Sequence, residues 1–187
     1  MNYNTLMQKL PKKFFERDAV TVAKDLLGCV LEKDGVSGMI VETEAYSDDE
    51  ASHAFTKTPR SILMHETHGH AYVYFTYGMH YCFNVTCDKK KPGAVLIRAL
   101  LPLDGVSKMK KRRDMTDEKN LTNGPGKLTQ ALAINKTDNG TEIGEHIKIY
   151  HYKKFAPKHI LSTPRIGISK AIDLHWRFLV QDPESRE

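Results

Sequence analysis

The sequence lacks most of the features that would place it in a special structural class. Its 187 residues include 3 cysteines, Cys29, Cys82 and Cys87, whose odd number and spacing make neither a disulfide framework nor a structural zinc site. No apolar run approaches the ~20 residues of a membrane helix, and the first residues lack the apolar stretch of a secretory signal. No repeat or low-complexity tract is present. We therefore expect a cytoplasmic protein with reduced thiols and no membrane association.

The composition that is present is that of an ordinary globular protein. Apolar residues make up 40% of the chain and charged residues 27%, which predicts one domain over residues 1–187 with loosely ordered ends at 1–13 and 182–187. The net charge of +5 favours a polyanionic partner, because cations that neutralise phosphates release counterions. We expect the chain to act as a monomer.

Turn and capping signals place the elements of a mixed fold. Asp18 is suited to begin a short helix and Gly28 to end it, and Asp34-Gly35 is a hairpin turn pair between two strands. Further strand signals lie at 71–86, 93–103, 147–152, 164–170 and 176–180, and helix signals at 105–114 and 121–134. The pattern predicts an α+β fold: one domain with a curved, mostly antiparallel β-sheet, surrounding helices and a protruding hairpin.

The histidine-rich stretch HETHGH at 65–70 is the place where a metal-binding hypothesis has to be tested. Zinc hydrolases of the H-E-x-x-H type need their histidines four residues apart on one helix face. Here His65 and His68 are three apart, and Gly69 disfavours a long helix. A loop that gathers His65, His68 and His70 remains an alternative, but solvent-exposed loop histidines are favoured and no metal is expected.

The segment VETEAY at 41–46 contains the candidate carboxylates. Alternation along a strand places Glu42, Glu44 and Tyr46 on one face of the sheet. Two such carboxylates either meet water or Arg98, or one of them acts as a general base beside an aromatic pocket wall. The spacing does not choose between Glu42 and Glu44.

The aromatic hairpin at 71–86 separates into two faces and a tip. Tyr72 and Tyr74 share one face of the first strand, and Phe75 lies on the other. Tyr72 and Phe75 are expected in the core. Tyr77 lies beside Gly78 at the tip, where its ring cannot pack into the core formed by its own sheet. An exposed ring of this kind needs another molecule to cover it.

The ordered motifs VETEAY, DEASH, TPR, YVYFTYGMHYCFNVT, GAVLIRALLPL, GPGKLTQALAI and PRIGISK closely resemble the methylpurine (alkyladenine) DNA glycosylase family. The resemblance extends from about Phe14 to Val180. It implies a monofunctional enzyme that flips damaged purines out of double-stranded DNA, hydrolyses the N-glycosidic bond and leaves an abasic site. It implies neither an organic cofactor nor a metal.

The resemblance also implies roles for individual residues. Glu44, the second glutamate of ETEAY, would be the base that activates the attacking water, and Arg98 in the RAL strand would help to hold that water.

The damaged base would be held in a stacking pocket and recognised at its edge. Tyr46, Tyr74 and His53 would form the pocket around the flipped base. Asn84, after the hairpin, would crowd the purine edge and disfavour unmodified guanine.

Other residues would contact the duplex. Tyr77 would enter the minor groove and fill the gap left by the flipped nucleotide, which makes the hairpin a DNA probe. Met79 and His80 would be its neighbours in the wedge, and Lys127 in the GPGKL turn would touch a phosphate. The chain departs from the family pattern in the short segment between Tyr46 and His53 and in having a histidine at position 80. These departures bear on which damaged bases the enzyme accepts.

Three alternative functions differ from this hypothesis. A non-catalytic nucleic-acid-binding module would use the same basic surface and hairpin without chemistry. A helix-hairpin-helix glycosylase is suggested by NGPGKL, although this turn lacks the alternating apolar and glycine pattern of that motif. A metal-dependent hydrolase would use His65, His68 and His70.

Overall fold

The computed structural model describes residues 7–76 and 78–182, which form an α+β fold. The strands are β1 (Val30–Lys33), β2 (Val36–Tyr46), β3 (Ala71–Thr76), β4 (His80–Cys87), β5 (Gly93–Asp104), β6 (Ile147–Tyr150), β7 (Ile160–Thr163) and β8 (Arg177–Val180). The α-helices are α1 (Ala19–Asp25), α2 (Ile62–Glu66), α3 (Val106–Arg113) and α4 (Pro125–Leu132). Short 3₁₀ turns lie at Lys12–Glu16, His53–Phe55, Glu118–Asn120, Lys136–Asp138 and Pro157–His159.

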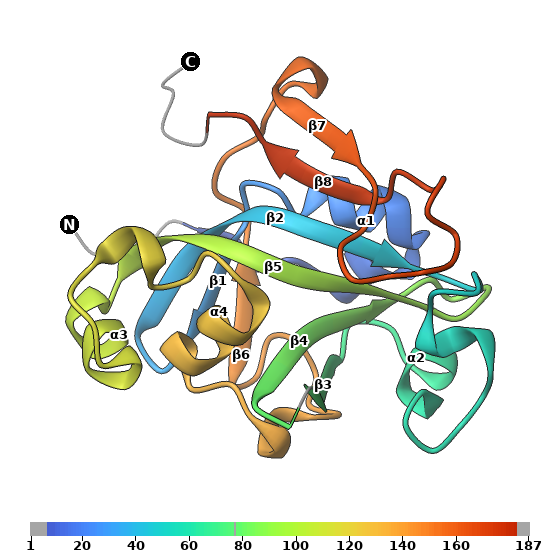
Figure 1. Ribbon diagram of the computed structural model, residues 1–187, viewed down its shortest axis with the longest axis horizontal. Helices are drawn as coiled ribbons and strands as arrows, with labels where there is room; N and C mark the ends of the chain where they lie inside the picture. Colours follow the sequence, from blue (N-terminus) through green and yellow to red (C-terminus); the bar gives the residue numbers. More distant parts are fainter. Residues whose placement is uncertain (1–6, 77, 183–187) are drawn as a thin grey trace.

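A single sheet organises the molecule. Its strand order is β3-β4-β5-β2-β1-β6, and β8 pairs with both β2 and β7. The pairs formed by neighbouring strands are antiparallel. The long strands β2 and β5 cross the middle of the molecule, with α3 towards one end and α2 towards the other (Figure 1). The expected α+β class and mostly antiparallel sheet are confirmed.

Local signals explain the first elements. The side chain of Asp18 accepts a hydrogen bond of 2.9 Å from the Thr21 N–H and caps α1. Gly28, after the helix, has φ +85°, and a Cβ there would lie 2.2 Å from the Lys153 carbonyl oxygen, so no other residue fits. Asp34 and Gly35 both have positive φ in the turn that joins β1 to β2.

The pairing of β2 with β5 contains three register shifts, of which the two in the middle of the strands are opposed bulges. Val41 on β2 and Arg98 on β5 are skipped in the register, on either side of the Glu42–Ala99 pair. A bulge re-aims side chains near it. The two extra residues cancel, because the register beyond them is the same as before them.

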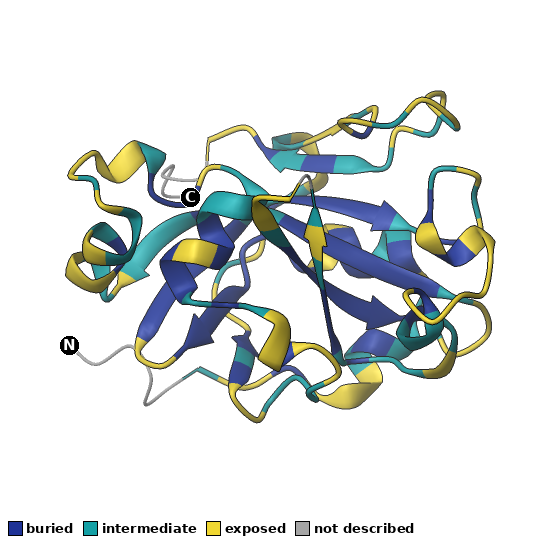
Figure 2. Ribbon diagram, turned by 60° about the horizontal axis from the view of Figure 1, so that its bottom comes forward, coloured by how far each residue is buried: buried dark blue, intermediate teal, exposed yellow. Residues whose placement is uncertain are grey.

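The core lies on both faces of the central strands. Figure 2 shows the sheet strands as mostly buried and the connections around them as mostly exposed. Large buried side chains such as Phe15, Phe83 and Ile97 belong to one continuous cluster. Leu10 is buried too, and its N–H donates to the Ile149 carbonyl, within the 1–13 stretch for which loose order was expected.

Two sequence-based expectations are wrong. The segment 164–170 is not a strand; β7 ends at Thr163 and the chain then runs as an irregular loop. Phe75 is not in the core, since it is 51% exposed. Its ring contacts that of Tyr81 on β4, with the centroids 5.0 Å apart, and is otherwise half exposed.

The described residues contain no helix that is both long and apolar enough to cross a membrane.

Candidate active site

A cavity of about 350 Å³ opens where β2, β3, β4 and β5 meet the beginning of α4 and the loop 164–168. This volume is in the range of small-molecule sites, ~300–1,000 Å³. We call it the active-site cavity. It is lined by Tyr46, Ala51, His53, Arg60, Met64, Tyr72, Tyr74, Thr76, His80, Cys82, Asn84, Leu96, Arg98, Pro125, Gly126, Ile166, Gly167 and Ile168.

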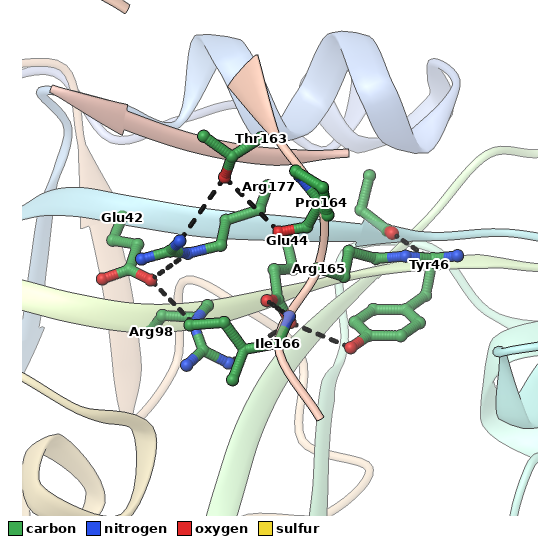
Figure 3. Close-up of polar contacts among 10 residues, drawn as sticks. Glu42, Glu44, Tyr46, Arg98, Thr163, Pro164, Arg165, Ile166 and Arg177 are labelled. Atoms are coloured by element: carbon green, nitrogen blue, oxygen red, sulfur yellow. Dashed lines mark hydrogen bonds and ion pairs between the residues drawn. The ribbon is translucent and has the colours of Figure 1, made fainter. Parts of the chain in front are cut away.

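Glu44 lies directly behind the wall of this cavity, with 0% of its surface exposed. Its Oε1 accepts 2.7 Å from the Ile166 backbone N–H, and its Oε2 accepts 2.9 Å from the Tyr46 hydroxyl. Arg98 Nη1 is 3.3 Å from Oε2. The three donors belong to residues that line the cavity, and Figure 3 shows these residues beside the carboxylate.

Glu42 has a different environment on the same strand. Its Oε1 accepts 2.8 Å from Arg98 Nε and 2.7 Å from Arg177 Nε, and Glu42 does not line the cavity (Figure 3). The alternation of Glu42, Glu44 and Tyr46 places all three on the side of Arg98, as the spacing predicted. Neither glutamate lines the cavity, but their partners differ: Glu42 bridges two arginines, of which only Arg98 lines it, whereas all three donors to Glu44 do.

Aromatic rings form one side of the cavity. His53 and Tyr74 pack edge to face with centroids 4.8 Å apart, and Tyr72 and Tyr74 lie 5.4 Å apart. His53 Nδ1 and the Tyr72 hydroxyl share a hydrogen bond of 2.8 Å. Tyr46 faces the same cavity from β2. The structure thus brings Tyr46, His53 and Tyr74 together around one space.

The protonation of these rings follows from burial. Burial raises the pKa of Tyr46, and the adjacent Glu44 carboxylate raises it further, so the phenol keeps the proton that it donates. Burial, with Cys82 as the next cause, also raises the pKa of Tyr74. Partial burial and the positive charge of Arg60 lower the pKa of His53, which favours the neutral imidazole.

The rim of the cavity is formed by the β3–β4 hairpin and α4. His80 lines the cavity, and a Cβ at Gly126 would lie 2.8 Å from its ring, so the hairpin and the helix are in contact. Met79 is 67% exposed at the hairpin end. Lys127 follows Gly126, and its Nζ donates 2.7 Å to the Asn123 side-chain oxygen. Tyr77, expected at the tip, lies outside the described residues.

Asn84 is held rigidly in the cavity wall. It is buried on β4, and its Nδ2 donates 3.0 Å to the Tyr72 carbonyl across the hairpin. A side chain anchored in this way presents a fixed shape to any ligand.

Comparison with known proteins gives the family. The model of the methylpurine-DNA glycosylases matches residues 13–184. The chain belongs to the methylpurine-DNA glycosylase family. It is accordingly a DNA glycosylase, a hydrolase that acts on N-glycosyl bonds, and the resemblance read from its motifs is confirmed. The alternatives of a binding module without catalysis and of a helix-hairpin-helix enzyme are wrong.

Relatives in the family match over most of their length. A protein of Carboxydothermus hydrogenoformans is 47% identical over 182 residues, which covers 92% of this chain and 95% of the relative. One of Rhodopseudomonas palustris (strain BisB18) is 46% identical, covering 91% of this chain and 86% of the relative. One of Rhizobium johnstonii is 46% identical, covering 95% and 88%. Each is named as a candidate 3-methyladenine DNA glycosylase.

The cavity of this family member contains residues that sequence reasoning missed. Tyr72 was expected in the core; it is buried but also lines the cavity, a placement that its alternation with Tyr74 already allowed. Arg60 of the TPR motif lies over the Tyr74 ring, 4.7 Å from its centroid. The third missed group is the Ile166 N–H. It belongs to the backbone, so no residue type in the sequence could have indicated its role.

The three histidines of HETHGH do not form a metal site. Among the residues that the structure describes, which include all three, no group of three or more metal-ligating side chains is close enough to hold an ion. His65 lies in α2, and His68 and His70 are half-buried instead of exposed. His70 Nδ1 lies 3.1 Å from the His68 carbonyl oxygen.

Proposed function

We propose that this glycosylase excises alkylated purines from double-stranded DNA, with Glu44 as the general base that activates water. The observation that carries the proposal is the setting of Glu44: a buried carboxylate fixed against the cavity wall by three donors. An ionised carboxylate has about four acceptor positions. Three are used, and we assign the fourth to the attacking water, which reaches Glu44, 0% exposed here, once a residue of the cavity wall moves aside.

The reaction needs one proton transfer to protein. Water attacks C1′ of the deoxyribose while the N-glycosidic bond breaks and its electron pair leaves with the base. Glu44 takes the proton of the water, and its negative charge stabilises the oxocarbenium character of the sugar. Arg98, 3.3 Å from Glu44 and exposed to the cavity, orients that water. An alkylated purine that carries a positive charge leaves as a neutral base.

The rings supply the free energy that base extrusion requires. Flipping a nucleotide costs a few kcal/mol, and stacking on an aromatic side chain returns ~1–3 kcal/mol per base. Tyr46 and Tyr74, with His53 beside them, provide such faces, and π faces attract a cationic base further. Tyr77, with Met79 and His80 beside it, fills the gap left in the duplex.

Selectivity and docking rest on other residues. Asn84, anchored to the Tyr72 carbonyl, crowds the purine edge and disfavours unmodified guanine. Lys127, beside the cavity rim, contacts a DNA phosphate. The enzyme works as a monomer in the cytoplasm, on the nucleoid in a bacterial cell.

The enzyme is proposed to be monofunctional. Among the described residues that line the cavity there is no lysine. The cavity therefore supplies no side-chain amine that could attack C1′ and so lead to cleavage of the DNA backbone.

The test is excision from duplex oligonucleotides that each carry one damaged purine, followed by hot alkali to cleave abasic sites. Alkali-dependent cleavage at an alkylated purine, with no adduct after borohydride and with full activity in a chelator, is expected. Binding without any product would contradict the proposal. A borohydride-trapped adduct would contradict the monofunctional mechanism alone.

A further inference from the structure

The loop between β7 and β8 contains a buried arginine that the proposed reaction does not use. The structure describes every residue from 164 to 176, and Arg165 alone among them is buried. Its side chain is 0% exposed. Placing a guanidinium in the interior is costly unless it is paired and hydrogen-bonded, so the contacts that compensate this cost indicate what the residue does.

Arg165 joins two segments that are distant in sequence. Its Nη2 and Nη1 donate 2.6 Å and 3.1 Å to the two carboxylate oxygens of Asp49, a bidentate pair. Nη1 also donates 3.1 Å to the Ala45 carbonyl. The other end of the loop is fixed to the same strand, because the Ala45 N–H donates 2.8 Å to the Trp176 carbonyl.

The guanidinium also packs against two rings. It lies 4.8 Å from the centroid of Tyr46 and 5.3 Å from that of Trp176. Tyr46 is thus supported by Arg165 while its hydroxyl donates to Glu44 and its ring lines the cavity. Figure 3 shows Arg165 beside Tyr46, with Ile166 on the side of Glu44.

The residue after Arg165 completes the connection. The Ile166 N–H donates 2.7 Å to Glu44 Oε1, the shortest of the three contacts that hold this carboxylate. Asp49 in turn accepts 3.0 Å from the Ala51 N–H and shapes the turn that leads to His53. One ion pair therefore fixes the stacking ring, the carboxylate and the approach to His53.

We propose that the Arg165–Asp49 pair is a positioning device for the reaction: it holds Tyr46 and the Ile166 N–H in the geometry in which Glu44 and the flipped base meet. The inference rests on the proposed function. It assigns Arg165 no contact with substrate, and its effect reaches the chemistry through Tyr46 and Glu44.

The rival explanation is that Arg165 only stabilises the fold, and the chain contains a matched control for it. Lys33 and Asp138 form another buried ion pair, with Nζ 2.7 Å from Oδ2 and side chains 9% and 7% exposed. Neither residue lines the active-site cavity. Arg165→Met and Lys33→Met each remove a buried cation from a carboxylate, but only the first removes a neighbour of Tyr46.

The experiment compares wild type, Arg165→Met, Arg165→Lys, Asp49→Asn and Lys33→Met below their melting temperatures. Single-turnover excision of an alkylated purine is measured, with affinity for a duplex that carries a tetrahydrofuran abasic analogue. We expect a rate loss of about 100-fold in Arg165→Met, since a misplaced reacting group costs that much. Arg165→Lys keeps the charge but lacks the two parallel N–H donors of the guanidinium, so its excision rate should fall by about 10-fold. Affinity should change by less than about 3-fold, and Lys33→Met should keep its rate.

A further readout separates positioning from folding. Trp176 is the single tryptophan of the chain, so its emission reports whether the contact with Arg165 is lost in a folded variant.

The outcomes are distinct. Equal rates in wild type and Arg165→Met, or equal rate losses in Arg165→Met and Lys33→Met, would overturn the positioning role while the proposed function stands. If wild type released no alkylated purine, the proposed function would fail and this inference with it. A rate loss confined to the Arg165 and Asp49 variants, with the affinity for the abasic analogue kept, supports it.

Discussion

Two cavities on opposite faces of β2 differ in what their carboxylates can do. Thr43 directs its hydroxyl to the Ala23 carbonyl in α1, whereas Glu44 borders the active-site cavity. The second cavity, which we call the α1 cavity, has a volume of about 700 Å³, twice that of the active-site cavity. Its lining includes Asp25 and Phe14. Size alone would select the α1 cavity instead of the cavity in which we propose the reaction.

The chemistry of the two carboxylates explains the difference. Asp25 is 49% exposed and pairs with Arg17 at the surface, where solvent screens the pair. Glu44 is fully buried and receives three fixed donors. Preorganised donors in a site that excludes water contribute much more than the same donors in solvent. A buried carboxylate with fixed donors therefore supports the proposed reactive face, which the cavity volume does not.

The largest expected effect comes from the carboxylates themselves. Glu44→Gln should lower the single-turnover excision rate by ~10²–10⁴-fold, because the general base is lost. Asp25→Asn in the α1 cavity should leave the rate within about 2-fold of wild type, as expected for an exposed pair. Rates are compared on one alkylated duplex. Full activity in Glu44→Gln would show that Glu44 is not the general base.

A smaller effect is expected from the rings. Tyr74→Ala should weaken binding of the flipped base by ~1–3 kcal/mol, or about 5- to 150-fold, while Tyr74→Phe, which keeps the stacking face, should retain most of the affinity. Phe14→Ala removes a ring of the α1 cavity and should have no such effect. Equilibrium titration with a lesion-containing duplex checks this, and equal losses in the Tyr74→Ala and Phe14→Ala variants would contradict the assignment.

The cations of the two cavities should differ in their salt dependence. Lys127→Ala should reduce the slope of log affinity against log salt concentration by ~0.9, the value for one phosphate contact. Lys24, an exposed lysine of the α1 cavity, should leave the slope unchanged when it is replaced by alanine. An unchanged slope in Lys127→Ala would remove this residue from the DNA interface.

The smallest expected effect is a change in titration. The positive charge of Arg60, after burial, lowers the pKa of His53. Arg60→Gln should therefore raise the pKa of His53, so that the imidazole becomes protonated at a higher pH than in wild type. The chemical shift of the His53 ring, followed by NMR across pH 5–8, measures this. A pKa that stays the same or falls would show that Arg60 does not act on the ring.

Much of the fold followed from local chemistry in the sequence. The Asp18 cap, the Asp34-Gly35 turn and the alternation that sets Glu44 and Tyr46 on one side of β2 depend only on neighbouring residues. The family motifs then indicated which side chains share the cavity, and the structure does bring Tyr46, His53 and Tyr74 together.

What sequence reasoning missed depends on contacts between distant residues. Ile166 and Ile168 alternate as in a strand, yet Ile166 is 49% exposed, and its N–H is used by Glu44, 122 positions away, instead of by a neighbouring strand. The burial of Arg165 has the same origin, since its partner Asp49 is 116 positions away. Neither long-range contact has a local signature.

The opposed bulges at Val41 and Arg98 tie the length of this chain to its chemistry. Val41 and Arg98 pair with no residue, so losing Val41 would remove its bulge and leave the pairs on either side of it intact. Side chains alternate with a period of two, so losing a paired residue such as Thr43 would slip the rest of β2 by one position and turn Glu44 towards α1. Homologous genes should therefore tolerate codon insertions and deletions in the surrounding loops, or the loss of Val41, far more readily than a change of length between Glu42 and Tyr46.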